Sequence, residues 1–230
     1  MICRTNKEPE RIVSKIRPPI IEAVNVQVKT QGKYKTKTGQ PRGLVVHFTA
    51  GHSRKGREDA INTLNNLAFK GLGCLVMDDH GKIYRAQNQF LDDVAYHCGS
   101  SEWIKTKGIS SYCMGMEICN AGKLSPKLAL AGKVDKYSSW FGEEYYPDEV
   151  RYVHEMNMNQ FPGYYHKFTK EQEDSLWQFC KWQKDINPEF DYDWVVGHDE
   201  IAVPLGRKND PGGSLSCDMQ DFRFSLKKLV

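Results

Sequence analysis

Long apolar runs are absent from this sequence. Each apolar segment spans only a few residues, far fewer than the roughly 20 that a transmembrane helix needs, so no transmembrane segment is predicted. The first residues, Met1 to Lys7, also lack the apolar central region of a secretory signal. We therefore expect synthesis in the cytoplasm without Sec-type export.

Paired cysteine spacings are also missing. The seven cysteines are odd in number and form no Cys-x-x-Cys motif, which favours reduced thiols over a disulfide framework or a structural zinc site. Cys98, Cys113 and Cys119 are expected to be small buried hydrophobic residues.

Neither charge is in strong excess. The formal net charge is +3, which suits an anionic polymer but does not require nucleic acid, whose binding usually needs a concentrated basic face. Charged residues make up 27% and hydrophobic residues 40% of the 230 positions, as is typical of a soluble globular protein. This length allows one sizeable domain plus an extension.

The order of predicted elements indicates the fold class. Strands are predicted near 20–28, 44–48, 74–77, 82–86, 113–118 and 194–197, with a hairpin turn at 78–81 that leaves His80 facing solvent. Helices are predicted over 57–70, 169–186 and 218–229, and a short one from Asp148 includes His154. This order predicts an α/β fold with a central mixed β-sheet flanked by helices.

Two of these strands lead into ionisable side chains. The strand near 44–48 ends at His47 and runs into small residues, and the strand near 194–197 leads to His198. Prolines and glycines between 204 and 213 make the following segment a loop, which adds the amine of Lys208 and the carboxylate of Asp210. A loop with this many ionisable side chains suggests a functional site, although taken alone it is equally compatible with a solvated turn.

A third strand contains a carboxylate within an apolar run. Glu117 lies inside Met114 to Ile118, and burying a charged group without a partner is costly. Glu117 is therefore either paired or facing a cavity.

Together these segments resemble the zinc-dependent N-acetylmuramoyl-L-alanine amidase family, which includes bacteriophage T7-type lysozymes, muropeptide amidases and peptidoglycan recognition proteins. The matching motifs are His47 to Gly51, Gly115 to Glu117, Gly197-His198 and Gly206 to Gly212. The resemblance covers roughly Gly43 to Pro211. It implies an amidase type 2 fold, with a catalytic domain over 43–230, an aromatic-rich insertion around 121–168 and a basic extension over 1–42.

The resemblance also implies a reaction. His47, His198 and Asp210 would hold one Zn²⁺ per chain and leave the fourth position for water. Glu117 would take a proton from this water and pass it to the leaving amine. Lys208 would stabilise the oxyanion formed from the amide between N-acetylmuramic acid and L-alanine.

Substrate contacts are expected from two further residues. His97, in Ala95 to Gly99, resembles a family histidine that lines the substrate groove, and the alternative is a hydrogen-bonded histidine at the start of a loop. An exposed indole at Trp103 would suit stacking on a sugar ring. Gly73 stands where some members carry an assisting tyrosine, so the proton transfers would fall to Glu117.

Several alternatives are open. Cys217 competes with Asp210 as third ligand, because some phage relatives use cysteine, but Lys208-x-Asp210 matches the muropeptide amidases. The insertion is either a groove wall that reads glycan or peptide, or a satellite hydrophobic cluster. The basic residues before 43 either touch anions of a wall or membrane, or form a solvated connector.

The functional expectation is a monomeric lytic enzyme of the endolysin type, made in a host cytoplasm and acting on peptidoglycan in the cell wall after release. Neither nucleic acid nor a membrane span is expected as part of its function. A recognition module that binds peptidoglycan without cleaving it is one alternative. A cytoplasmic amidase that recycles soluble muropeptides is another.

Overall fold

A six-stranded mixed sheet forms the centre of the computed structural model, which describes residues 16–26, 36–38, 40–89, 93–128, 134–155 and 160–228. In spatial order its strands are β1 (Ile21–Val24), β5 (Ile83–Ala86), β4 (Leu75–Met77), β9 (Cys113–Ile118), β3 (Gly43–Phe48) and β15 (Val195–Gly197). The β4 and β5 strands pair antiparallel, and the other neighbours are parallel. The predicted fold class is confirmed, including the hairpin.

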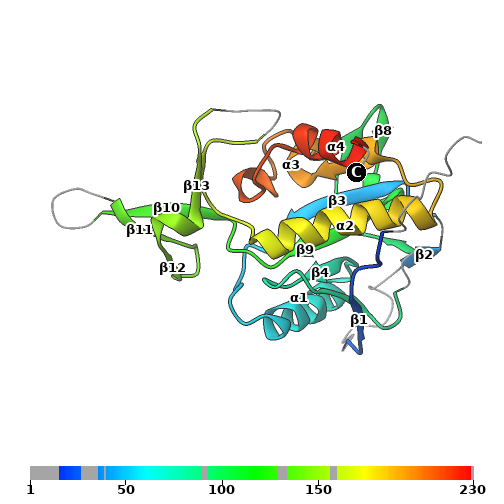
Figure 1. Cartoon of the computed structure of the whole chain (residues 1–230), viewed down its shortest axis with the longest axis horizontal. Coiled ribbons are helices and arrows are strands. Elements are labelled where there is room, and N and C mark those ends of the chain that lie inside the picture. Colours follow the sequence, from blue (N-terminus) through cyan, green and yellow to red (C-terminus); the bar gives the residue numbers. More distant parts are fainter. Residues whose placement is uncertain are drawn as a thin grey trace, which may run out of the picture.

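The two faces of this sheet are covered differently (Figure 1). Helices α2 (Lys170–Ile186) and α4 (Met219–Lys227) pack on the face that carries Leu44, Val46 and Phe48. Helix α1 (Arg57–Lys70) packs on the opposite face, which carries Val76. Because successive side chains of a strand point to opposite faces, His47 lies on the α1 side.

The helix ends follow the sequence signals. Thr169 begins α2 with a capping box, in which its hydroxyl accepts from the amide of Gln172. Gly71 ends α1 in the left-handed conformation, with φ of 74°. The three long helices therefore form close to where the sequence predicts them.

A second sheet is built from the aromatic-rich insertion. Its five strands, in spatial order, are β12 (Glu144–Tyr145), β11 (Val134–Ser138), β10 (Lys123–Leu128), β14 (Gly163–His166) and β13 (Val150–Val153). Figure 1 shows β10, β11 and β12 projecting from one end of the molecule. Tyr145 and Leu124 are buried in a small cluster of their own, so the satellite cluster exists.

The predicted helix from Asp148 is wrong. A 3₁₀ turn, η2 (Pro147–Glu149), leads directly into β13, and His154 follows that strand. The β-branched and aromatic residues of β13 pair with β14, and such cross-strand pairing overrides a local helical pattern.

Shorter elements complete the described chain. They are β2 (Thr36–Thr38), β6 (Asp93–Ala95), β7 (Glu102–Trp103), β8 (Thr106–Lys107), η1 (Ile109–Ser111), η3 (Tyr192–Trp194), α3 (His198–Ile201) and η4 (Gly212–Ser214). The predicted strand over 20–28 is shorter, as β1, and forms an edge of the central sheet, while 27–28 lie outside the described residues. Most of the basic connector before 43 also lies outside them.

Two further expectations concern side chains and membrane spans. Cys98, Cys113 and Cys119 are buried free thiols, and the side chain of His80 is 78% exposed, as expected. Among the described residues, no helix combines the length and the apolar character that crossing a bilayer would demand.

Candidate metal centre and active site

Strand register brings two of the candidate residues together. His47 on β3 is the direct neighbour of Glu117 on β9, and both side chains point to the α1 face. His198 follows β15, the strand on the other side of β3. The predicted convergence of separate strand ends is therefore found in the structure.

Three ligand-type atoms meet at one point. Nδ1 of His47 lies 2.9 Å from Nδ1 of His198 and 2.9 Å from Oδ2 of Asp210. Nδ1 of His198 lies 3.0 Å from the same oxygen. All three residues are buried, so the atoms face one another with little competing solvent.

The protonation states of this group suit a divalent cation. Burial, followed by the nearby His198, lowers the pKa of His47 to about 4, so its imidazole is neutral at neutral pH. Burial alone would raise the pKa of Asp210, but its contacts with His198 and His47 hold it well below its usual range. Neutral imidazoles and an ionised carboxylate are the forms that coordinate zinc.

The tautomer of His198 provides a further test of the fit. Its Nε2 lies 3.0 Å from the carbonyl oxygen of Cys98, and a carbonyl can only accept. Nε2 therefore donates to this carbonyl, and in the tautomer with its proton on Nε2 the Nδ1 atom presents a lone pair to Asp210. Two lone pairs at 3.0 Å repel unless a cation lies between them, so the donor set fits a bound metal ion.

A cavity of about 510 Å³ opens over these residues, within the usual size range of ligand sites. His47, His198 and Asp210 line it together with Glu117 and Lys208. One wall comes from α1, through Thr63, Asn66, Leu67 and Lys70. The cavity gives a substrate access to the three ligand atoms.

Glu117 faces this cavity, as the second of its two expected environments. Part of its side chain is accessible, but Oε2 is covered and has no hydrogen-bond partner. Burial, and then the charge of Asp210, raise the pKa of Glu117 to about 8, while Lys208 and Lys70 oppose the shift. An unpartnered carboxyl oxygen with a raised pKa is suited to proton transfer.

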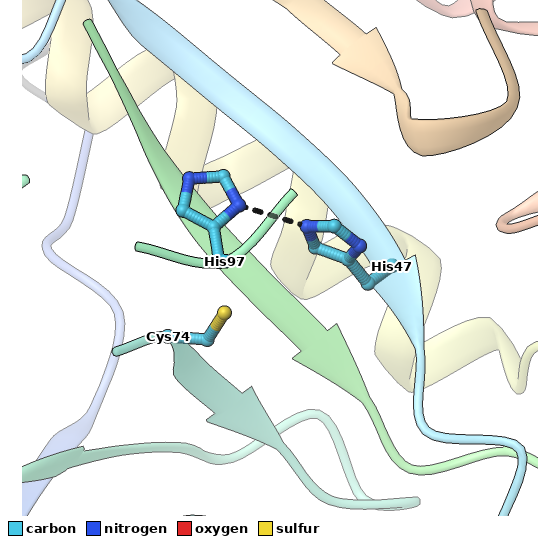
Figure 2. A group of neighbouring side chains, drawn as sticks. All are labelled: His47, Cys74 and His97. Carbon is cyan, nitrogen blue, oxygen red and sulfur yellow. Dashed lines mark hydrogen bonds between the residues drawn. The ribbon is translucent and has the colours of Figure 1, made fainter. Parts of the chain in front are cut away.

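His97 also lines the cavity. Its Nδ1 lies 3.0 Å from Nε2 of His47, a contact that Figure 2 draws as a dashed line between the two rings, which lie 85° apart in plane. Burial, followed by His47, lowers the pKa of His97 to about 3, so its ring is neutral at neutral pH. His97 therefore matches both of its expected environments: it lines the cavity, and its ring is hydrogen-bonded.

The structure does not bring Trp103 to the cavity. Its indole Nε1 donates to the carbonyl of Asp193 at 2.9 Å, and the ring lies in another hollow beside Arg223. The β7–β8 hairpin turns this side chain toward η3. The polar neighbours of Trp103 suggested exposure, but they carry no information about that distant contact.

Two cysteines, Cys74 and Cys217, are candidates for a sulfur ligand. Among the described residues, His47, His198 and Asp210 form one group that could hold a metal, and His47, Cys74 and His97 form another. Cys217 belongs to neither, and the structure brings Asp210 to the histidines in its place. Burial raises the pKa of the Cys74 thiol well above its usual value. Sequence patterns gave no signal for Cys74, which reads as one more apolar strand residue.

Sequence reasoning also missed residues at the rim. Arg207 donates to the carbonyls of Cys98 and Ser100, which ties the loop before Asp210 to the segment after His97. Trp140, from the insertion, donates its indole proton to the carbonyl of Ala50, a cavity-lining residue. Such contacts span about a hundred positions of sequence, so local patterns cannot reveal them.

Comparison with known proteins identifies a family. The sequence model described as N-acetylmuramoyl-L-alanine amidase matches residues 37–213. Among curated proteins, no significant match is found.

Several solved structures are similar. A selenomethionine derivative of AmpD is 16% identical, with a TM-score of 0.53, covering 93% of this chain and 98% of that one. The endolysin LysCS, an N-acetylmuramoyl-L-alanine amidase from Clostridium intestinale, is 13% identical, with a TM-score of 0.52, covering 93% and 99%. AmpDh3 from Pseudomonas aeruginosa, in complex with an anhydromuramic pentapeptide, is 20% identical, with a TM-score of 0.52, covering 86% and 65%. At these identities the likeness shows a shared fold.

Proposed function

Because the chain belongs to the N-acetylmuramoyl-L-alanine amidase family and is an enzyme of that activity, we propose that it works with one Zn²⁺ held by His47, His198 and Asp210. The observation that carries this proposal is the meeting of two imidazole nitrogens and one carboxylate oxygen within 3.0 Å of one another. The cavity above them supports it, because zinc in catalytic sites keeps one position open.

The residues around the cavity have separate roles in this proposal. A bound zinc supplies Lewis acidity and brings the pKa of a water to about 7. A nearby cation favours the ionised form of Glu117, in which the free Oε2 accepts a proton from the attacking water and returns it to the leaving amine. Lys208 places an ammonium at the same cavity, where it stabilises the negative charge that develops on the amide oxygen.

The proposal also includes a lytic role for the enzyme. We place this enzyme on polymeric peptidoglycan, as an endolysin that is made in a host cytoplasm and reaches the wall after release. The insertion supports this assignment, since it adds an exposed aromatic residue beside the cavity. A recycling amidase acts on soluble muropeptides, for which such an extended surface has no evident use.

The test is the release of stem peptides with a new N-terminal L-alanine. Purified protein loaded with zinc should release them from intact sacculi, and a chelator should abolish the release until zinc is restored. Turnover that resists complete removal of the metal would overturn the mechanism. Binding of muropeptide without any turnover in the presence of zinc would favour a recognition module.

The lytic and recycling roles are separated by a second comparison. Rates are measured on intact sacculi and on soluble anhydro-muropeptides that carry the same stem peptide. The lytic role predicts efficient turnover of sacculi. Turnover confined to the soluble substrate would assign the protein to recycling.

A further inference from the structure

Trp140 is the most exposed large aromatic residue of the insertion. Its residue surface is 78% exposed, yet its indole Nε1 donates to the carbonyl of Ala50 at 2.5 Å. The polar edge of the ring is therefore satisfied by protein, while the apolar ring surface faces solvent. An indole held in this way is a rigid, open platform.

The loop that carries Trp140 is fastened to the segment after β3. Nδ1 of His52 lies 2.5 Å from Oε1 of Glu143, and the ring of His52 lies against Phe141 with centroids 4.6 Å apart. Arg54 donates to Glu149 at 2.7 Å. These contacts set the position of Trp140 relative to the cavity, because Ala50 both binds the indole and lines the cavity.

We propose that Trp140 is a sugar-binding subsite, on which a hexosamine ring of the glycan strand stacks. This inference rests on the proposed function. The amide that the enzyme cleaves is attached to a sugar, so a glycan whose amide reaches Glu117 must cross the cavity rim, and Trp140 stands at that rim. Apolar sugar faces match an indole surface whose N–H is already used.

Other exposed aromatic residues of the insertion provide a comparison. Tyr146 is 57% exposed, and the amine of Lys136 lies 5.6 Å from its ring centre. No contact links its side chain to a residue that lines the cavity within the described structure. Tyr146→Ala is therefore a matched control for Trp140→Ala.

The binding test uses a β-1,4-linked N-acetylglucosamine tetramer and the full-length protein. In ¹H–¹⁵N spectra the indole signal of Trp140, assigned by its loss in Trp140→Phe, should shift on titration. Trp140→Ala should lose the binding, and Tyr146→Ala should keep it. An unchanged indole signal would overturn the subsite. This measurement needs no catalysis, so its outcome is independent of the proposed activity.

The kinetic test compares two substrates with the same amide. One is a soluble disaccharide-peptide, and the other is a D-lactoyl-L-alanyl peptide that has no sugar ring. Trp140→Ala should lower kcat/KM on the first by about fivefold, the size expected for one aromatic stacking contact, and leave the second unchanged. An equal loss on both substrates, or no loss on either, would contradict the proposal.

A second inference follows independently from the contacts of His97. Its Nε2 lies 3.0 Å from the carbonyl oxygen of Cys113, so this nitrogen must donate. Nδ1 of the neutral ring then has no proton and accepts from Nε2 of His47 at 3.0 Å. Since the proton of His47 is on Nε2, its Nδ1 carries the lone pair that faces His198 and Asp210.

The packing of β9 makes room for this arrangement. A Cβ at Gly115 would lie 2.8 Å from Cγ of His97 and 2.6 Å from Sγ of Cys74. Figure 2 shows Cys74 near the two histidines, immediately before β4, the strand next to β9. Glycine at 115 therefore lets the imidazole of His97 sit against the sheet, within reach of His47.

From this chain of hydrogen bonds we infer that His97 is a positioning residue for the metal ligand His47. The carbonyl of Cys113 sets the tautomer of His97, and His97 sets that of His47. The lone pair of His47 is thereby fixed toward the proposed metal before any metal binds. Partners of this kind commonly change metal affinity by about 10- to 100-fold.

The test compares His97→Leu with His97→Gln in the zinc-loaded protein. Leucine removes the acceptor, and the zinc dissociation constant, measured by competition with a chelator, should rise by about 10-fold or more. Glutamine can accept from His47 and donate to Cys113, so it should restore most of the affinity. An equal loss in both variants, or none in either, would overturn the positioning role.

A spectroscopic measurement separates this role from simple packing. In ¹⁵N spectra of zinc-free protein, His47 should carry its proton on Nε2 in the wild type and in His97→Gln. In His97→Leu the Nδ1–H form should be populated as well. If the wild type binds a second zinc that Cys74→Ala abolishes, His47, Cys74 and His97 hold an ion themselves and the inference fails.

Discussion

His47 and His198 take their second ring contacts from segments far along the chain. His198 donates to Cys98, and His47 contacts His97, so both Nδ1 atoms turn toward Asp210. Two imidazole nitrogens and one carboxylate oxygen that face one another are a set of ligands that a shared zinc ion accepts. The chemistry of the site is therefore decided by the individual residues at these positions.

Removing one member of this group should remove the metal. Asp210→Asn keeps the shape of the side chain but replaces the charged ligand with a weaker neutral one. We expect its zinc dissociation constant to rise by at least about 100-fold, a loss beyond that of an outer partner, and His47→Ala to retain no stoichiometric zinc. Metal analysis after dialysis measures both. Wild-type zinc content in Asp210→Asn would contradict the assignment.

Glu117 should make the stability of the metal-free protein depend on pH. Its pKa is raised from 4.5 to about 8 in the folded protein, so between these values the folded state holds a proton that the unfolded state has released. Stability from this group is therefore lost as pH rises from about 5 to about 8. Glu117→Gln should lack this loss.

Urea unfolding at several pH values in the presence of a chelator measures the difference. The wild type should lose stability relative to Glu117→Gln as pH rises, and added zinc should weaken the effect, because a nearby cation favours the carboxylate. Parallel pH profiles of the two metal-free proteins would show that Glu117 is not held in this environment.

At the scale of elements, the insertion supports the loop that carries Asp210. Arg151 of β13 donates to the carbonyls of Gly213 and Ser214 at 3.0 and 3.3 Å, and also to that of Leu215. Gln160 donates to the carbonyl of Gly212 at 2.7 Å. The five-stranded sheet therefore helps to hold the candidate site in place, because it binds the backbone that follows a candidate metal ligand.

Arg151→Met should therefore destabilise the protein. It leaves backbone carbonyls without their donor, and we expect the free energy of unfolding to fall by about 2 kcal/mol. The matched control is Arg57→Met, which removes an exposed ion pair with Glu22 and should cost much less, because water screens exposed pairs. Equal effects of the two changes in urea unfolding would contradict the role of Arg151.

Sequence patterns predicted the helices and strands whose hydrophobic residues recur with a clear period. The helix over 57–70, the hairpin after it and the strands of His47 and Glu117 are found where expected, because local amphipathicity and turn residues determine them. The convergence of His47, His198 and Asp210 came from the family resemblance. Periodicity alone gives no distances between separate segments.

The missed features depend on contacts distant in sequence. Where a helix was expected from Asp148, residues 150–153 form the strand β13, because β14 pairs with them. Trp103 turns toward Asp193, and Trp140 takes the position at the cavity rim. No local pattern distinguishes these two tryptophans, since each partner lies about 90 positions away.

On the scale of the whole molecule, two unlike sheets share one site. The central sheet supplies the buried histidines, and the insertion supplies Trp140 at the rim and Arg151 behind the Asp210 loop. Metal binding should therefore stabilise the folded chain as a whole. His198 directly follows β15 of the central sheet, and the insertion binds the backbone after Asp210.

Zinc should accordingly raise the melting temperature of the protein. A ligand that binds the folded state at about 100 times its dissociation constant adds about 2.7 kcal/mol of stability. We expect a rise of several degrees in a thermal scan when zinc is added to chelator-treated wild type, and none for His47→Ala. An equal rise in both proteins would place the stabilising metal elsewhere.

X-ray absorption spectroscopy of the zinc-loaded protein tests the metal centre most directly. With one zinc per chain, the spectrum should show imidazole nitrogens and oxygen at about 2.0 to 2.2 Å and no sulfur. A sulfur ligand at about 2.3 Å would mean that Cys74 or Cys217 binds the metal, and the assignment of His47, His198 and Asp210 would be contradicted.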